Sequence, residues 1–481
     1  MPGDDAPIPN ARPRRILVIG GGPSGLVTLR NLLDRGDFVD VQLVERRDDV
    51  GGVWCAVLKR RPAINLTKAC RNFNQNDRWP SPAYEGLVGN VLPEFLSFSA
   101  HPHFPEPPST KDGQPFPSLT ETQEYLRAFA APLLAAGRIR LGLEVLRVEE
   151  LQQREGWRVL LRDRDGKDVE EQWDAVVVAV AFYDNEAYPD TPGVDTLREN
   201  GLTTHCRTWR GPQGYDGKRV LVVGNANSGN DIAAQLAPVA SAVYQSIRRP
   251  NFPGFPSLPD ERIARVKPVV EYTVGDDSKT AQARLADGSV LGALDCVIFA
   301  TGYYPHPSFV YVRAADDTLA PLVGPTHRHI PALHRYTLYA FNPSLAFVGT
   351  AVASYTPFTI ADICSTWLAL AWSTTAPISY PTSRKELLAF EQQRFDTVAQ
   401  ISAELEAQEG TVASALLSYC LGPYEETFAS DLRCDAVAAR PELDAVLPVW
   451  NAERIEAREA MFAVKREALE RARDAAAAQA S

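Results

Sequence analysis

Two glycine-rich turns of the type that binds dinucleotides lie on this one chain, each directly behind a short apolar run. The first turn is Gly20-Gly21-Gly22-Pro23-Ser24-Gly25, after Ile16–Ile19, and the second is Gly224-Asn225-Ala226-Asn227-Ser228-Gly229, after Val220–Val223. A single GxGxxG turn is weak evidence. Two turns, each following a buried-type strand and opening a helix, predict an α/β fold with two Rossmann-like domains that hold two nucleotides side by side. That arrangement allows a flavin to receive a hydride from a nicotinamide.

The first turn, called the first fingerprint below, is followed by an acid at the expected place. Gly20 permits the tight turn, Gly22 lets the backbone approach a pyrophosphate, and Gly25 lets helix and strand pack closely. The helix that starts at Pro23 and Ser24 faces the phosphates with its N-terminus. Glu45 ends the second strand, where a carboxylate accepts hydrogen bonds from ribose and repels a 2′-phosphate. The first site is therefore predicted to bind FAD or NAD, and not NADP.

The second turn, called the second fingerprint below, is followed by two cations in place of an acid. Ala226 replaces the middle glycine, and Arg248 and Arg249 come directly after the strand that ends at Ile247. A guanidinium fork at that place matches a 2′-phosphate, which selects NADP over NAD. A solvated basic pair is the alternative interpretation. The predicted ligands of this nucleotide are Gly224, Asn227, Ser228, Gly229, Arg248 and Arg249.

Further motifs give the chain a family resemblance. Gly51-Gly52-Val53-Trp54, Tyr84–Asn90, Phe299-Ala300-Thr301-Gly302-Tyr303 and the spaced set Glu199-x-Gly201-x-x-x-His205-x-x-x-Trp209 occur in that family's order around the two fingerprints. Together they resemble the flavin-containing monooxygenase family over residues 14 to 375.

The resemblance implies a reaction and a set of site residues. It implies that NADPH reduces FAD, that O₂ adds at flavin C4a to give a hydroperoxide, and that a soft nitrogen or sulfur nucleophile of a small molecule takes the distal oxygen. Asn90 is implied to act at the flavin. A turn-capping loop asparagine is its alternative role, as a core tryptophan is for Trp54 and a structural histidine for His205. The cofactor-binding set implied beyond the fingerprints is Gly52, Val53, Trp54, Asn90, His205, Thr301 and Gly302.

Several positions depart from the family pattern. Glu199 replaces a phenylalanine, Leu92 replaces a proline, and Val180-Ala181 replaces an expected Thr-Gly pair. Residues 58–79 resemble an insertion beside the substrate side, so the sequence does not identify the substrate.

Three other functions are alternatives to this one. A Baeyer–Villiger monooxygenase acting on a ketone is the first alternative, because Trp209 fits its signature, although Arg210 then follows in place of proline or aspartate. A flavin-dependent NADPH oxidase or reductase is the second alternative. Among such reductases, a disulfide reductase requires a redox-active CxxC or CxxxxC pair, and the seven scattered cysteines do not provide one. A non-enzymatic flavin-binding scaffold would leave the second fingerprint without a purpose.

The composition limits the partners and the location. A net charge of −11 argues against nucleic acid and anionic membranes as partners. Scattered cysteines suit a reducing compartment. No apolar run approaches the roughly 18 residues of a membrane span. These features predict a cytoplasmic enzyme whose partners are a small-molecule substrate and O₂.

The order of the motifs predicts the domain boundaries. We expect a disordered leader over 1–13, an FAD-binding domain over 14–204 and 295–380, an NADP-binding domain over 205–294, and a helical C-terminal extension over 381–481. The closing helix, predicted over Glu453–Ala478, has little apolar stripe. It is interpreted as a solvated helix, with a homo-oligomer contact as the alternative.

Overall fold

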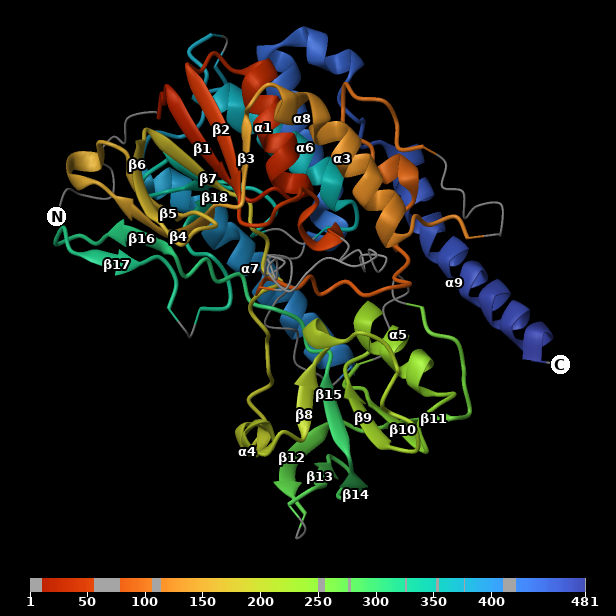
Figure 1. Ribbon diagram of the computed structural model, residues 1–481. Coiled ribbons are helices and arrows are strands. Elements are labelled where there is room, and N and C mark those ends of the chain that lie inside the picture. Colours follow the sequence, from red (N-terminus) through yellow and green to blue (C-terminus); the bar gives the residue numbers. More distant parts are fainter. Residues whose placement is uncertain are drawn as a thin grey trace, which may run out of the picture.

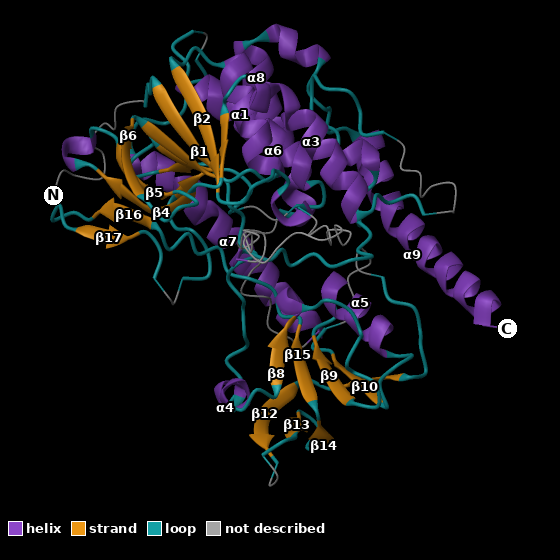
Figure 2. Ribbon diagram, in the orientation of Figure 1, coloured by secondary structure: helices purple, strands orange, loops and turns teal. Residues whose placement is uncertain are grey.

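The protein consists of two α/β units and a group of C-terminal helices (Figure 1; Figure 2). The computed structural model describes residues 11–55, 78–105, 114–249, 256–275, 278–324, 327–351, 354–375, 377–409 and 421–480. Most of the predicted leader and of the predicted insertion at 58–79 lies outside these ranges. Disorder was predicted for Ala11 and Arg12, but the structure shows both residues in ordered contacts. Ala11 donates its N–H to Tyr380 Oη at 3.1 Å, and the Arg12 side chain donates to the Ala371 carbonyl at 2.6 Å.

A seven-stranded sheet in the order β18-β19-β20-β7-β1-β2-β3 forms the centre of the first unit. Strand β1 pairs in parallel with β2 on one side and with β7 on the other. All of β7 and the last four residues of β1 are buried, as expected for parallel strands covered on both faces. The strands are β1 Arg15–Ile19, β2 Asp40–Glu45, β3 Ile139–Leu141, β7 Ala175–Val178, β18 Leu333–His334, β19 Leu338–Tyr339 and β20 Leu345–Phe347.

Three helices and a second sheet complete the first unit. Helix α1 (Pro23–Arg35) packs against α6 (Pro357–Trp372), and the fully buried Asp362 of α6 accepts a hydrogen bond from Asn31 at 2.9 Å. Helix α3 (Leu119–Ala135) starts in a capping box. The second sheet has the order β17-β16-β4-β5-β6, with β4 Glu144–Glu150, β5 Trp157–Arg162, β6 Asp168–Trp173, β16 Val310–Arg313 and β17 Leu319–Pro321.

The second unit is built on a five-stranded parallel sheet in the order β11-β10-β9-β15-β8. A smaller antiparallel sheet, β12-β13-β14, lies beside it (Figure 1). The elements are α4 Val194–Glu199, β8 Thr203–His205, β9 Arg219–Val223, α5 Asn227–Leu236, β10 Ala242–Ser246, β11 Ile263–Val266, β12 Val269–Val274, β13 Ala281–Leu285, β14 Val290–Leu294 and β15 Cys296–Phe299.

The pairing of this sheet moves the predicted domain boundaries outward. Boundaries at 204/205 and 294/295 would cut through β8 and leave β15 in the first unit. In the structure β15 pairs with both β9 and β8, because β9 needs a partner on its second edge. The second unit therefore begins at α4 and ends at β15.

The C-terminal part is helical, as predicted, with α7 over Arg384–Glu409, α8 over Glu425–Ala439 and α9 over Ala452–Ala480. The interpretation of α9 as a solvated helix is wrong for one of its faces, since Met461 is 2% exposed and Ala468 is 4% exposed. Arg458 and Lys465 share that face, at spacings of three and four residues. Their charges conceal the stripe from a hydrophobicity pattern. Within the described ranges, none of the helices has the length and apolar character that crossing a bilayer requires.

Candidate active site

The first fingerprint adopts the geometry that a dinucleotide turn requires. Gly20 has φ of +110°, and Gly22 is the N-cap of α1 in extended conformation. A Cβ added to Gly25 would lie 1.8 Å from the carbonyl oxygen of Gly20, so strand and helix approach as closely as glycine permits. At Gly22 the nearest atom to an added Cβ is 3.5 Å away, which leaves space for a phosphate over the first turn of α1.

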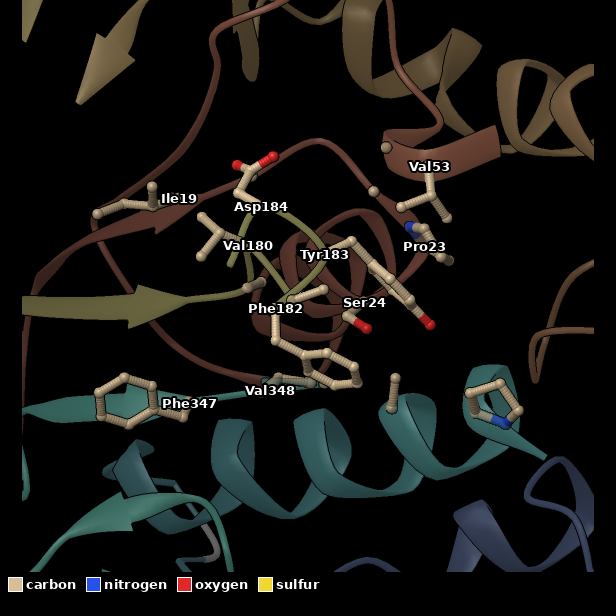
Figure 3. Close-up of a pocket in the computed structure, with 18 of the residues that line it drawn as sticks. Ile19, Pro23, Ser24, Val53, Val180, Phe182, Tyr183, Asp184, Phe347 and Val348 are labelled. Atoms are coloured by element: carbon tan, nitrogen blue, oxygen red, sulfur yellow. The ribbon is translucent and has the colours of Figure 1, made fainter. Parts of the chain in front are cut away.

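A cavity of about 590 Å³ opens at this turn (Figure 3). Figure 3 shows Pro23, Ser24, Val53, Phe182, Tyr183 and Val348 among the residues that line it. The structure thus brings together nine of the sequence-predicted site residues: Gly20, Gly22, Pro23, Ser24, Glu45, Gly52, Val53, Trp54 and Asn90.

Glu45 stands at the end of β2 with its carboxylate fixed against the fingerprint. It is 5% exposed and accepts hydrogen bonds from the backbone N–H of Gly21 (2.7 Å) and of Arg47 (2.8 Å). An ionised carboxylate has about four acceptor positions, so two remain for ribose hydroxyls. The acid predicted to read the ribose is held beside the turn.

The loop after β2 closes back on the same turn. Gly51 donates its N–H to the carbonyl of Gly21 at 2.9 Å, and Gly52–Trp54 form a short 3-10 helix, η1. Trp54 is half-buried and lines the cavity. Cys55, at the end of η1, is 3% exposed, and burial raises the pKa of its thiol to about 11. Such a thiol packs and does not react at neutral pH.

Asn90 reaches the cavity because the segment before it is held to the start of α3. Val88 forms a β-bridge with Ser118, and Gly89 donates its N–H to the Pro117 carbonyl at 2.8 Å. These contacts give the loop a fixed backbone and place Asn90 on the cavity wall.

The departure at Val180-Ala181 has a structural counterpart. Ala181 has φ of +56°, the left-handed region that favours glycine, which is the residue expected at this position. The turn it makes presents Phe182 and Tyr183 to the cavity (Figure 3). The backbone of the pattern is kept although its side chains have changed.

The second fingerprint repeats the geometry of the first in the second unit. Gly224 has φ of +117°, and a Cβ on Gly229 would lie 2.3 Å from the Gly224 carbonyl oxygen. Helix α5 starts at Asn227, with Ala226 as its N-cap. The side chain of Asn225 donates to the Arg249 carbonyl at 2.8 Å. The basic pair therefore lies next to the turn, with Arg248 exposed.

Thr301, Gly302 and His205 lie at the junction between the two units. Thr301 donates its hydroxyl to the Ala187 carbonyl, and Ala187 donates its N–H to Gly302, which ties the two connecting segments together. His205 is 1% exposed, and burial lowers its pKa to about 4. Its ring packs between Tyr188 and Tyr303, with ring centroids 5.4 and 5.2 Å away.

Several predicted residues do not line the 590 Å³ cavity. Those at the second fingerprint or at the junction between the two units are His205, Gly224, Asn227, Ser228, Gly229, Arg248, Arg249, Thr301 and Gly302. Gly25 of the first fingerprint also lies outside the cavity lining.

Sequence reasoning missed part of the cavity wall and one contact of the second fingerprint. Arg46 and Arg47 line the cavity beside the first fingerprint. Gly349 lies so close to α1 that an added Cβ would be 2.1 Å from Ser24 Oγ. A glycine two residues after the apolar strand β20 was the available signal. Lys465 of α9 donates a hydrogen bond to Asn227 Oδ1 at 2.6 Å, and no sequence motif predicts this contact.

A family described as FMO-like, flavin-binding monooxygenase-like, matches residues 13–252. Flavin-containing monooxygenase FMO GS-OX-like 9 of Arabidopsis thaliana is 30% identical over 349 residues, which cover 70% of this chain and 71% of that relative. The chain belongs to the flavin-containing monooxygenase family. It is a flavin-dependent monooxygenase with FAD and NADP(H) as its cofactors, and the predicted resemblance is confirmed.

Two further proteins place this monooxygenase among its relatives. The thiol-specific monooxygenase of Saccharomyces cerevisiae is 26% identical over 373 residues, covering 76% of this chain and 78% of the relative. The structure of S-allyl-L-cysteine S-oxygenase from Allium sativum superposes with a TM-score of 0.69 over 95% of this chain and 93% of that chain, at 23% identity. At that identity the second comparison establishes the shared fold alone.

Proposed function

We propose that this monooxygenase uses FAD and NADPH to oxygenate a soft nucleophile of a small molecule, with sulfur preferred to nitrogen. In the balanced reaction NADPH and one proton supply two electrons and two hydrogens. One atom of O₂ forms a bond to the substrate lone pair, and the other leaves as water. Bound flavin supplies the chemistry that passes the two electrons from the nicotinamide to O₂.

One observation carries this proposal: most of the first fingerprint, its acid Glu45 and Asn90 line a single cavity. Part of the wall around them is apolar and buried, with Phe347, Val348, Phe358 and Ile360 each at most 3% exposed. Such a wall excludes water and so protects a reactive oxygen species from decay. Arg46 and Arg47 supply positive charge on the diphosphate side.

The second fingerprint is proposed to hold NADPH through its phosphates. Arg248 and Arg249 are proposed to bind the 2′-phosphate, since the Asn225–Arg249 hydrogen bond keeps the pair beside the turn. The hydrogen bonds of Thr301 and Gly302 to Ala187 are proposed to fix the distance between the two nucleotides.

The choice of sulfur rests on what the related proteins are named for. The relative from Saccharomyces cerevisiae is named as thiol-specific. Sulfur is polarizable and, because it is weakly basic, its lone pair is not protonated at neutral pH and is available as a nucleophile. Trp209 keeps the ketone alternative open, although it is 3% exposed and donates to Gln235 at 3.3 Å, away from the cavity.

The test is a comparison of products under ¹⁸O₂. The enzyme is supplied with NADPH and, in separate reactions, with an aryl methyl thioether, a tertiary amine or a cyclic ketone. Mass spectrometry is expected to find a sulfoxide carrying one ¹⁸O, with one NADPH consumed per product. A lactone from the ketone, without sulfoxide or N-oxide, would overturn the proposal.

A further inference from the structure

The C-terminal helix α9 reaches the second fingerprint. Lys465 Nζ donates a hydrogen bond to Asn227 Oδ1 at 2.6 Å, and Asn227 is the first residue of α5. The two residues are 238 positions apart in the sequence. In Figure 1 α9 runs from the first unit along the side on which α5 lies.

Lys465 is held in place by the residues on its own face of α9. Met461, one turn before it, accepts the N–H of Leu92 on its sulfur at 3.3 Å. Ala468, nearly one turn after it, is buried. Arg458, two turns before it, pairs with Glu426 at 2.8 Å. The lysine therefore comes from an anchored helix face, and its ammonium does not sample the surface freely.

The positive charges at the N-terminus of α5 and on Lys465 favour the binding of an anion between them. The first turn of a helix presents unpaired N–H groups and the positive end of the helix dipole, so a cation beside it is repelled. Asp231, one turn farther along α5, offsets part of that repulsion. Burial outweighs this attraction and lowers the pKa of Lys465 to about 8. A charged ammonium at a glycine-rich phosphate turn is stabilised when a phosphate lies between the two.

We propose that Lys465 binds the pyrophosphate of NADP(H), so that the C-terminal helix completes the second nucleotide site. This inference rests on the proposed function, in which the second fingerprint holds that nucleotide. Lys465 and the N-terminus of α5 grip the pyrophosphate from two sides, whereas Arg248 and Arg249 grip the 2′-phosphate. Asn227 positions the ammonium until the nucleotide arrives.

The experiment is a pair of binding measurements on the FAD-loaded protein. Lys465→Met keeps the length and packing of the side chain but removes its charge. Isothermal titration measures the Kd of NADP⁺ and of adenosine 2′-monophosphate, which has the 2′-phosphate but no pyrophosphate. We expect Lys465→Met to weaken NADP⁺ by about 10- to 100-fold, because one charged hydrogen bond is lost. Adenosine 2′-monophosphate should change by less than about twofold.

Two further variants control for structural damage. Arg466→Met removes a neighbouring charge whose side chain is exposed and faces Glu470, and it should leave both Kd values unchanged. Lys465→Arg should retain most of the affinity for NADP⁺.

The outcomes separate this inference from the proposed function. An unchanged Kd for NADP⁺ in Lys465→Met would overturn the inference about Lys465. Tighter binding of NADP⁺ by this variant would also overturn it, since Lys465 would then block the phosphate position. An equal loss for both ligands would also overturn it, since the effect would then be structural. A selective loss of NADP⁺ in a protein that makes no sulfoxide would keep the inference and overturn the sulfur proposal. A parent chain that does not bind NADP⁺ would overturn both.

Discussion

The two fingerprints have nearly the same backbone but very different surroundings. Their first glycines have φ of +110° and +117°, and in both turns the last glycine meets the carbonyl oxygen of the first. The first turn faces a cavity and an acid, whereas the second lies beside the exposed Arg248, the half-buried Arg249 and a lysine from another helix. The backbone determines that a nucleotide binds, and the side chains around it decide which one and for how long. We expect the first site to retain FAD and the second to exchange its nucleotide at each turnover.

The largest effects should come from matched substitutions of the last glycines. Gly25→Ala places a Cβ 1.8 Å from the Gly20 carbonyl oxygen, and Gly229→Ala places one 2.3 Å from that of Gly224. We expect Gly25→Ala to be purified without flavin. Gly229→Ala should stay yellow but should no longer be reduced by NADPH, while dithionite still reduces it. Absorption spectra give both results, and a yellow Gly25→Ala would contradict the comparison.

Asn90 tests the role of the cavity wall at the first site. Asn90→Ala should still bind FAD and be reduced by NADPH, but it should release hydrogen peroxide in place of product. Losing one positioned donor costs about 2–4 kcal/mol at a reactive state. Peroxide and product are measured per NADPH consumed. Unchanged coupling would make Asn90 an ordinary loop residue.

Acid should weaken both units through one buried histidine in each. Burial lowers the pKa of His205 and of His334 to about 4, so the unfolded chain takes up their protons first as the pH falls. The free energy of unfolding should therefore drop between pH 6.5 and pH 4, by up to about 3 kcal/mol per histidine. His205→Gln should flatten this dependence, as measured by urea unfolding at several pH values. An unchanged slope would show that His205 does not titrate with folding.

Arg248 and Arg249 test what the second site recognises. Each contact with a 2′-phosphate is worth roughly 1.5–3 kcal/mol, so Arg248→Ala and Arg249→Ala should each weaken flavin reduction by NADPH by about 10- to 100-fold. Reduction by NADH should barely change, because NADH has no 2′-phosphate. If both variants keep the parent's preference for NADPH, the phosphate is recognised elsewhere.

The smallest effect concerns the strained turn beside the first site. Ala181→Gly relieves a left-handed φ of +56° and should raise the free energy of unfolding by about 1 kcal/mol. Thermal unfolding of the FAD-loaded protein measures it. A loss of stability would show that the alanine methyl group packs usefully in this turn.

The sequence was sufficient for the parts of the molecule whose chemistry is local. Gly20 to Gly25 and Glu45 could be placed because a strand, a turn and a helix follow one another within about thirty residues. In the structure Gly20, Gly22, Pro23, Ser24 and Glu45 line one cavity. The same local pattern predicted α5 and the strands on either side of it.

What could not be predicted depends on distant segments. Gly349 and Phe358 reach the cavity only because β20 pairs with β7, and nothing local signals that pairing. Lys465 was overlooked because cations on the buried face of α9 make it resemble a solvated helix. The boundary at β15 was misplaced because its segment leads directly into Thr301 and Gly302, which seemed to belong to the first unit.

The order of strands in the first unit has a consequence for how the chain folds. Strand β7 pairs with β20, although the entire second unit is synthesised between them. The first sheet therefore cannot be completed while the ribosome is still producing residues 194–299. The second unit is continuous in sequence and has its own hydrophobic core, so it can fold as soon as it emerges. The half of the molecule that is begun first is thus the half that is finished last.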